Sequence, residues 1–390
     1  MANDRNRSLD GLRALAISLV LVSHGFGIVG TSPFVPWPWP RPFSPASPGP
    51  MGVRIFFVLS GWLITGILLR ARNEASASGV SRARVWFAFY VRRCCRIFPL
   101  AYFAILVAFI VGVPNVRQHL RWYLFYGSNV LSAYQGAHVG ELAHFWSLAV
   151  EEQFYLVWPL VMLLVPMSRL PSLMLTLIAG SVVCRGLIYA FWTPHGGLAA
   201  YVLTVSRFDA LGIGGFLAVR PLSVRTLSIL ALAIVACGAV LPSAISAALT
   251  EFGLGLGCAG LVLAVANGWA SRVWSARPLV ALGTISYGVY VWHTLAGTIV
   301  LWIGQTFDVW MRWDNTFGWW RFTYVSAVAI GLASLSWFLI EKPINRLKRF
   351  APYVPRPEPA IVSESGGGTR PAGVESRRSA AVRAASSSDS

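Results

Sequence analysis

The chain contains few charged residues, and those it has are unevenly divided between the two signs. Charged side chains make up 12% of the 390 residues, with 32 lysines and arginines against 15 aspartates and glutamates. A typical soluble domain carries about 25% charged residues, so this composition argues against one. Hydrophobic residues reach 56% and the mean hydropathy is +0.61, which indicates a membrane protein.

Cysteine is also scarce, and its spacing lacks paired motifs. No CxxC pair occurs in the chain, and no cysteine has the histidine spacing of a zinc site. We therefore expect no metal site and no permanently bound cofactor. We interpret the five cysteines as small packing residues: Cys94, Cys95, Cys184, Cys237 and Cys258.

Apolar runs of about 20 residues recur along almost the whole chain, each long enough to cross roughly 30 Å of hydrocarbon. Backbone polar groups in lipid need internal partners, and continuous apolar runs do not fit the alternation of barrel strands. The sequence therefore predicts an all-α fold, a polytopic membrane helix bundle with about ten transmembrane helices. The predicted spans are residues 11–30, 52–70, 97–113, 146–165, 171–191, 200–219, 226–243, 250–268, 279–303 and 321–340.

The basic residues lie between the spans and in the C-terminal segment. A nucleic-acid-binding protein would collect them on one folded face, so the net charge of +17 does not indicate a nucleic-acid partner. The positive-inside rule instead predicts that both termini are cytoplasmic. The arginines that this orientation places inside, between the second and third spans, are Arg70, Arg72, Arg82, Arg84, Arg92, Arg93 and Arg96.

Two segments have the composition of irregular structure. Residues 31–50 contain eight prolines and two tryptophans, which predicts an extended outer loop. Residues 351–390 are rich in Pro, Ser, Ala, Gly and Arg, which predicts a disordered basic cytoplasmic tail. The expected organisation is a membrane domain over residues 1–350 followed by that tail.

Ionisable residues inside the spans are the informative ones, because each costs about 2.5–3.5 kcal/mol to insert at the bilayer centre. Arg13 and His24 belong to the first span, and eleven residues at 100° each bring them within roughly 20° of one helix face, about 16 Å apart. Imidazole is the side chain that accepts a proton near neutral pH. The pair fits an extended ligand, or a boundary arginine and a buried structural histidine.

Arg93 and Arg96 lie on one helix face at the predicted cytoplasmic boundary. Guanidinium forks match phosphate oxygens, so the two arginines could hold a phosphate, bind lipid headgroups or only signal topology. Ser60 and Gly61, in the second span, either let helices approach closely or take part in binding.

The fourth span begins with a polar segment. His144 and Glu151 are seven residues apart and share a helix face, and Trp146 and Ser147 lie between them. Glu151 could orient His24, bind sugar hydroxyls or pair with a membrane arginine. The remaining polar candidates form a further group, either substrate-binding or structural: Arg207 and Asp209, which we expect to pair with neighbouring helices, Tyr287, and His293.

Taken in order, these motifs resemble the acyltransferase 3 family of membrane acyltransferases over roughly residues 5–350. Arg13 and His24 match its Arg-ten-residues-His signature, and Arg93 and Arg96 match its Arg-x-x-Arg. The other matching runs are Phe56–Gly61, Trp146–Glu151, Ser286–His293 and Glu341-Lys342-Pro343, where we expect the proline to stop the last helix. We expect the hydrolase-like domain fused to some family members to be missing, because the polar tail is too short to form it.

The resemblance implies an enzyme of the bacterial cytoplasmic membrane that moves an acyl group, commonly acetyl, from acyl-CoA to a hydroxyl of a carbohydrate or glycosylated acceptor. Arg13, Arg93 and Arg96 would hold the phosphates of the donor. His24 would act as general base or carry the acyl group, with Glu151 as its partner.

Two other classes compete with this hypothesis. A transporter or flippase of a glycan or lipid-linked substrate would use the same buried polar residues, although no matching pair of broken helices supports it. The other membrane O-acyltransferase superfamily places its catalytic histidine late in the chain, where only His293 could serve.

Overall fold

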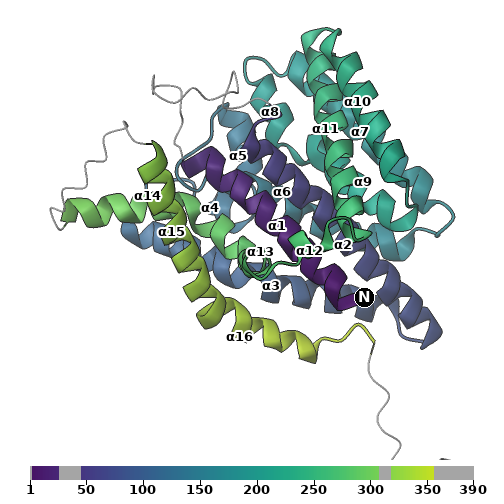
Figure 1. Ribbon diagram of the computed structural model, residues 1–390, viewed down its shortest axis with the longest axis horizontal. Helices are drawn as coiled ribbons and strands as arrows, with labels where there is room; N and C mark the ends of the chain where they lie inside the picture. Colours follow the sequence, from purple (N-terminus) through teal and green to yellow (C-terminus); the bar gives the residue numbers. More distant parts are fainter. Residues whose placement is uncertain (1, 26–44, 307–317, 355–390) are drawn as a thin grey trace, which may run out of the picture. The chain divides into compact units, whose positions relative to one another are not determined.

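The computed structural model describes residues 2–25, 45–306 and 318–354, and these residues form helices joined by turns, with no β-strand among them. Figure 1 shows their arrangement. The longer helices are α1 (Ala2–Gly25), α2 (Pro48–Ala77), α3 (Arg82–Val111), α6 (Phe145–Leu164), α7 (Leu170–Phe191), α9 (Thr204–Val219), α10 (Val224–Ala239), α11 (Ser243–Ala266), α14 (Ser286–Thr306) and α15 (Gly318–Ser336). The shorter ones are α4 (Leu120–Leu124), α5 (Ser128–Gln135), α8 (Gly196–Val202), α12 (Ser271–Trp274), α13 (Arg277–Thr284) and α16 (Lys342–Asn345).

Seven helical segments of the described chain are long and apolar enough to cross a membrane, or eight if the bent pair α13–α14 is one span. Each of the ten predicted ranges overlaps a helix, so the all-α membrane bundle is confirmed and its count of ten is approximate. The difference comes from α1, whose polar Asp10, Arg13 and His24 lower its hydropathy, and from α10, which has only 16 residues.

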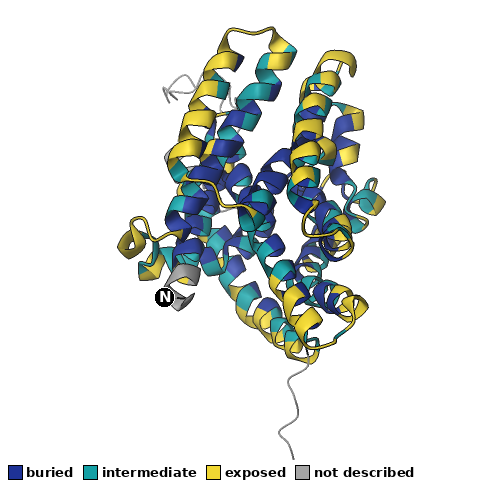
Figure 2. Ribbon diagram, turned by 90° about the vertical axis from the view of Figure 1, so that its right-hand side faces the viewer, coloured by how far each residue is buried: buried dark blue, intermediate teal, exposed yellow. Residues whose placement is uncertain are grey.

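The exposed surface of these helices is apolar, which is the reverse of a soluble protein. Helix α3 exposes Phe87, Phe103, Leu106 and Ile110, and other helices expose similar side chains. Figure 2 shows exposed residues along the outward sides of the helices and buried ones between them. Lipid is the solvent that such a surface requires, so the chain is an integral membrane protein.

Helix α1 crosses the middle of the view in Figure 1 and packs against α2, α11, α13, α14 and α15, and its residues 8–23 are buried or half-buried. Other close pairs are α2 with α9, α10 with α11, and α14 with α15. This packing explains why His24, on α1, meets a side chain from a distant part of the sequence.

Glycines allow α2 and α9 to touch backbone to backbone. A Cβ on Gly61 would lie 1.9 Å from the carbonyl oxygen of Leu211, and one on Gly214 would lie 2.1 Å from that of Val58. Real Cβ atoms do not approach this closely, so both positions need glycine. The close-approach interpretation of Gly61 is confirmed, as expected for helices that pack without a hydrophobic driving force.

Gly61→Ala should destabilise the fold, because the added methyl group forces α2 and α9 apart. We expect a loss of about 1–3 kcal/mol, the usual cost of overpacking, seen as a lower apparent melting temperature in detergent. Gly66→Ala is the matched control on the same helix, since its Cβ would meet only the Arg70 Nη1 atom at 3.8 Å. Equal melting temperatures for the two variants would contradict the packing argument.

The prediction that Pro343 stops the last helix is wrong, because the chain continues helically through α16 to Phe350. A π-helical turn over Trp337–Glu341 precedes the proline and accommodates its missing N–H. Of the predicted outer loop, residues 31–44 lie outside the described part, and its last residues begin α2. Residues 355–390 of the predicted tail also lie outside it.

Candidate active site

Three histidines from distant parts of the sequence form one cluster. The His24 ring, at the end of α1, lies 4.8 Å from the His293 ring of α14, and the His293 ring lies 4.6 Å from that of His144, at the start of α6. All distances are between ring centroids, and both contacts are edge-on. The sequence did not predict this cluster, because the three histidines are far apart in the chain. The available signal was the presence of imidazoles in apolar runs.

Hydrogen bonds fix the tautomers of these rings. The Nδ1 atom of His24 is 3.0 Å from the Val20 carbonyl oxygen, and that of His293 is 2.7 Å from the Tyr290 carbonyl oxygen. A carbonyl oxygen only accepts, so each Nδ1 carries the proton and each Nε2 has a free lone pair. Nε2 of His24 can therefore accept a proton.

His144 provides a third imidazole with a free nitrogen. Its Nδ1 lies 3.2 Å from the Glu141 carbonyl oxygen and 3.1 Å from the Thr294 hydroxyl oxygen. Among the described residues, no hydrogen bond reaches the buried Nε2 atoms of His144 and His293. Unpaired buried acceptors are costly, and a ligand hydroxyl would satisfy them.

Accessibility differs within the cluster. His293 is 1% exposed and His144 is 5% exposed, whereas His24 is an exposed residue. A Cβ placed on Gly49 would lie 3.9 Å from the His24 Cε1 atom, so α2 borders the ring on another side. His24 is thus the member of the cluster that a substrate can reach, and its ring faces α14.

Hydroxyl and indole groups continue the polar cluster into the bundle. The Tyr290 hydroxyl donates to the His144 carbonyl oxygen at 2.7 Å, so the Ser147 hydroxyl donates to Tyr290 at 2.5 Å. Trp146 packs against Tyr201 with 4.9 Å between ring centroids. The structure therefore connects the predicted Ser147 to the cluster through Tyr290, whereas Trp146 packs against Tyr201.

Glu151 does not contact His24 in the structure. Its two carboxylate oxygens accept hydrogen bonds from the Ser60 hydroxyl at 2.8 Å and the Tyr155 hydroxyl at 3.3 Å. His144 is at the histidine end of α6, and seven residues of helix place Glu151 about 10 Å deeper. In the structure Glu151 therefore holds these two hydroxyl groups, and its role in the site stays a prediction.

The predicted phosphate-binding arginines form a second group, with Arg13 near the middle of α1 and Arg93 and Arg96 on α3. Arg13 forms an ion pair with Asp10, and an Nη1 atom of Arg96 lies 3.6 Å from a carboxylate oxygen of Glu341. Arg13 and Arg93 both lie close enough to Arg96 and Glu151 to interact with them electrostatically. The three guanidiniums therefore share one region.

Unlike Arg13 and Arg96, Arg93 forms no ion pair within 4 Å with a carboxylate of the described residues. Its guanidinium lies over the rings of Phe89 and Tyr155, with 5.6 and 5.5 Å to the ring centroids. Within the described residues its buried Nε atom has no hydrogen-bond partner. Tyr287 belongs to this region as well, since its hydroxyl donates to the Ile97 carbonyl oxygen at 2.6 Å and its ring lies under Arg96.

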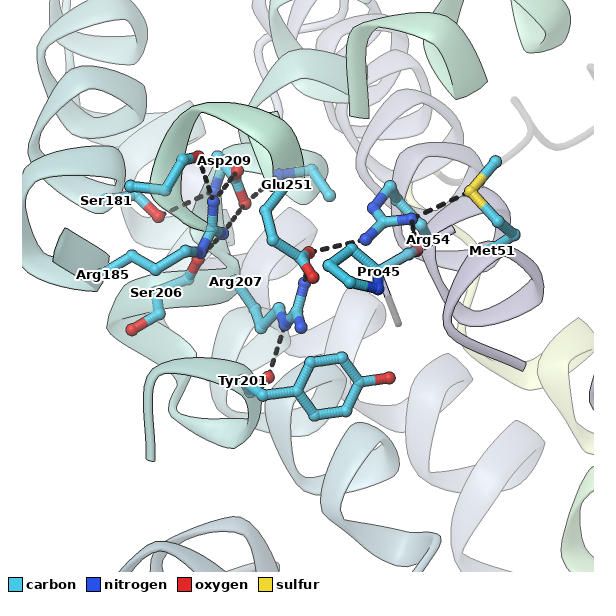
Figure 3. Close-up of polar contacts among 12 residues, drawn as sticks. Pro45, Met51, Arg54, Ser181, Arg185, Tyr201, Ser206, Arg207, Asp209 and Glu251 are labelled. Atoms are coloured by element: carbon cyan, nitrogen blue, oxygen red, sulfur yellow. Dashed lines mark hydrogen bonds and ion pairs between the residues drawn. The ribbon is translucent and has the colours of Figure 1, made fainter. Parts of the chain in front are cut away.

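A second polar network joins α2, α9 and α11 (Figure 3). Glu251 lies between two guanidiniums, with 2.6 Å to Nη2 of Arg54 and 2.5 Å to Nη1 of Arg207. Beside it, Arg185 forms a bidentate pair with Asp209 at 2.7 and 2.8 Å. The predicted pairing of Arg207 and Asp209 with neighbouring helices is confirmed.

Glu251 was not predicted, although a single glutamate in an apolar span was the available signal. Arg207 also lies 4.1 Å above the Tyr201 ring centroid and within 5.9 Å of that of Trp146, which connects this network to the cluster around Ser147. Across the described residues, no group of three His, Cys, Asp or Glu side chains has metal-binding geometry. The arrangement suits proton transfer and anion binding.

Comparison with known proteins identifies the family of the chain. The model of the acyltransferase 3 family, described as an acyltransferase domain, matches residues 6–338. The chain is 29% identical over 382 residues to the peptidoglycan O-acetyltransferase OatA of Listeria monocytogenes, which covers 87% of this chain and 56% of that protein. It is 28% identical over 383 residues to YrhL of Bacillus subtilis, whose name assigns it the same activity provisionally, with 86% and 54% covered.

The chain thus spans about half the length of these relatives. No solved structure matches it significantly. The family match covers the motifs from Arg13 to His293 and confirms the resemblance found in the sequence.

Proposed function

The chain belongs to the acyltransferase 3 family, and on this basis we propose that it is a membrane O-acyltransferase that moves an acetyl group from acetyl-CoA to a carbohydrate hydroxyl. The observation that carries the proposal is the His24 ring, whose protonated Nδ1 is held by the Val20 carbonyl oxygen so that Nε2 is free to act as a base. The names of the relatives favour an acceptor of the peptidoglycan type.

In the proposed reaction, Nε2 of His24 accepts the proton of the acceptor hydroxyl while the hydroxyl oxygen attacks the thioester carbonyl carbon. The carbon–sulfur bond then breaks, and the imidazolium returns the proton to the departing thiolate. The products are the acetyl ester and free CoA. General base catalysis of this kind contributes about 10²–10⁴-fold to a rate.

The other groups take positions on either side of this reaction. Arg93 and Arg96, together with Arg13, would hold the donor phosphates, with Arg93 as the principal contact because, among the described residues, it forms no ion pair within 4 Å whereas Arg13 and Arg96 do. Glu151 holds Ser60 and Tyr155 in place between the two ends of the bundle. The free Nε2 atoms of His144 and His293 would accept hydrogen bonds from acceptor hydroxyls.

We place the protein in the bacterial cytoplasmic membrane with both termini cytoplasmic. The arginine-rich ends of α2 and α3 support this orientation through the positive-inside rule. The guanidinium end then faces the cytoplasmic acyl-CoA pool, and the histidine end faces outward. The reading as a transporter or flippase has no comparable support, because one bent pair, α13–α14, is found in the described chain without a matching second pair.

The decisive experiment incubates the purified protein with radiolabelled acetyl-CoA and a soluble glycan fragment. We expect labelled acetyl ester and stoichiometric CoA release. Binding of the donor with neither product would support a carrier and contradict the enzyme.

His293→Asn should lower kcat about 2–10-fold, the rate equivalent of one lost hydrogen bond to the acceptor, with the KM for acetyl-CoA unchanged. Asparagine keeps a donor toward the Tyr290 carbonyl oxygen but removes the Nε2 atom beside His24. His119→Asn, before α4, is the control, because no ring contact connects it to the cluster in the described structure. A change confined to the KM for acetyl-CoA would contradict the assigned position of His293.

A further inference from the structure

A cavity of about 300 Å³ lies where the ends of α2 and α3 meet the C-terminal helical segment. It is separate from the histidine cluster, and its lining includes residues that no sequence motif singled out. The lining residues are Ile67, Arg70, Ala71 and Glu74 of α2, Arg92 and Arg93 of α3, and Lys348 and Tyr353.

The charge of this cavity is strongly positive. Four cationic side chains and the single carboxylate of Glu74 line it, which gives the lining a net charge of +3. Gathering cations around one small space is unfavourable, unless an anion neutralises them. A binding site for an anionic ligand is the simplest use of this arrangement.

Arg92 gives the cavity a fixed wall. Its Nη1 atom donates to the Lys348 carbonyl oxygen at 2.9 Å, and its guanidinium lies over the Tyr353 ring, 5.1 Å from the centroid. These contacts hold the segment around Lys348 and Tyr353 against α3. The ammonium of Lys348 and the guanidinium of Arg70 remain as the adaptable cations, and both side chains are partly or fully exposed.

The cavity also connects with the proposed donor site through Arg93. This residue lines the cavity and at the same time lies over the Tyr155 ring, whose hydroxyl donates to Glu151. The buried Nε atom of Arg93 lacks a partner within the described chain. An anion in the cavity would therefore be bound at the entrance to the polar interior.

We propose that this cavity binds a phosphate monoester, the 3′-phosphate at the nucleotide end of the acyl-CoA donor. A phosphate monoester carries about −1.5 to −2 charge at neutral pH and three acceptor oxygens, which matches several converging cations. A lipid phosphodiester carries one charge and matches the lining less well. The identity of the ligand rests on the proposed function, whereas the anion site rests on the cavity and its charges.

The test compares the binding of CoA and 3′-dephospho-CoA to the purified full-length chain by titration calorimetry. For the Arg70→Met/Lys348→Met double variant we expect the Kd for CoA to rise about 10–100-fold, the effect of losing charge-assisted hydrogen bonds, and the Kd for dephospho-CoA to stay constant. Arg349→Met is the matched control, because Arg349 adjoins Lys348 but does not line the cavity. Unchanged melting temperatures would show that the variants fold.

Equal losses for both ligands, or no loss for either, would overturn the proposal. Binding is measured in neutral detergent and again in nanodiscs with phosphatidylglycerol. A difference between wild type and the double variant that occurs only in competition with the anionic lipid would assign the cavity to headgroups and overturn the nucleotide ligand. Acetyl transfer is measured in parallel. A 3′-phosphate effect without acetyl transfer contradicts the proposed function alone. Acetyl transfer without a 3′-phosphate effect contradicts this inference alone.

Discussion

His24→Asn is expected to abolish acetyl transfer, with a fall in kcat of at least about 10²–10⁴-fold. The asparagine amide can still donate to the Val20 carbonyl oxygen, as Nδ1 of His24 does. It has no basic nitrogen at the position of Nε2, so the acceptor hydroxyl keeps its proton. The measurement is initial-rate transfer from acetyl-CoA in purified protein, with the amount of folded protein determined by size-exclusion chromatography.

Because the variant preserves the local hydrogen bond, it separates the loss of a base from the loss of structure. The Kd for CoA should remain within a few-fold of wild type, since eleven residues of helix, about 16 Å, separate His24 from Arg13. Retained turnover at the wild-type rate would remove His24 from the chemistry. A parallel loss of CoA binding would point to a collapsed bundle instead.

Glu251→Ala is expected to cost about 3–5 kcal/mol of folding free energy, the usual penalty for removing one partner of a buried ion pair. Glu251 is 7% exposed and bridges Arg54 and Arg207, which are 3% and 4% exposed. Its removal leaves two guanidiniums in a low-dielectric environment, with one hydrogen-bonding group lost to each. Since natural proteins are stable by about 5–15 kcal/mol, most of the folded protein should be lost at moderate temperature.

The apparent melting temperature in detergent and the yield of monodisperse protein measure this effect. Glu74→Ala is the control, because Glu74 is an exposed carboxylate on α2, the helix that also carries Arg54. Equal melting temperatures for the two variants would mean that Arg54 and Arg207 find other partners. The Arg185–Asp209 pair beside them should remain intact in either case, because its bidentate contacts do not involve Glu251.

The placement of His24 illustrates what could be predicted about the site. The helical repeat correctly assigned Arg13 and His24 to one helix, and the structure places Arg13 near the middle of α1 and His24 at its C-terminal end. What the repeat could not supply were the groups opposite them. The imidazoles of His144 and His293 reach His24 only because α6 and α14 pack next to α1.

The partners of Glu151 could not be predicted from the sequence. The sequence left open whether its carboxylate orients His24, binds sugar hydroxyls or pairs with a membrane arginine. The hydroxyl groups of Ser60 and Tyr155 satisfy the carboxylate instead. A buried carboxylate binds the donors that its neighbours offer, and these are unknown until the helices are packed.

The sequence by itself determined the membrane class, the helical spans and the family, because hydropathy, helical periodicity and short motifs are local properties of the chain. The tertiary structure alone decided which charges pair, as with Arg54, Arg207 and Glu251, and which cations converge on the cavity beside Lys348. The physical reason is the cost of an unpaired charge in a low-dielectric interior. Each buried ion must find its partner across helix boundaries, and such contacts between distant residues leave no local pattern in the sequence.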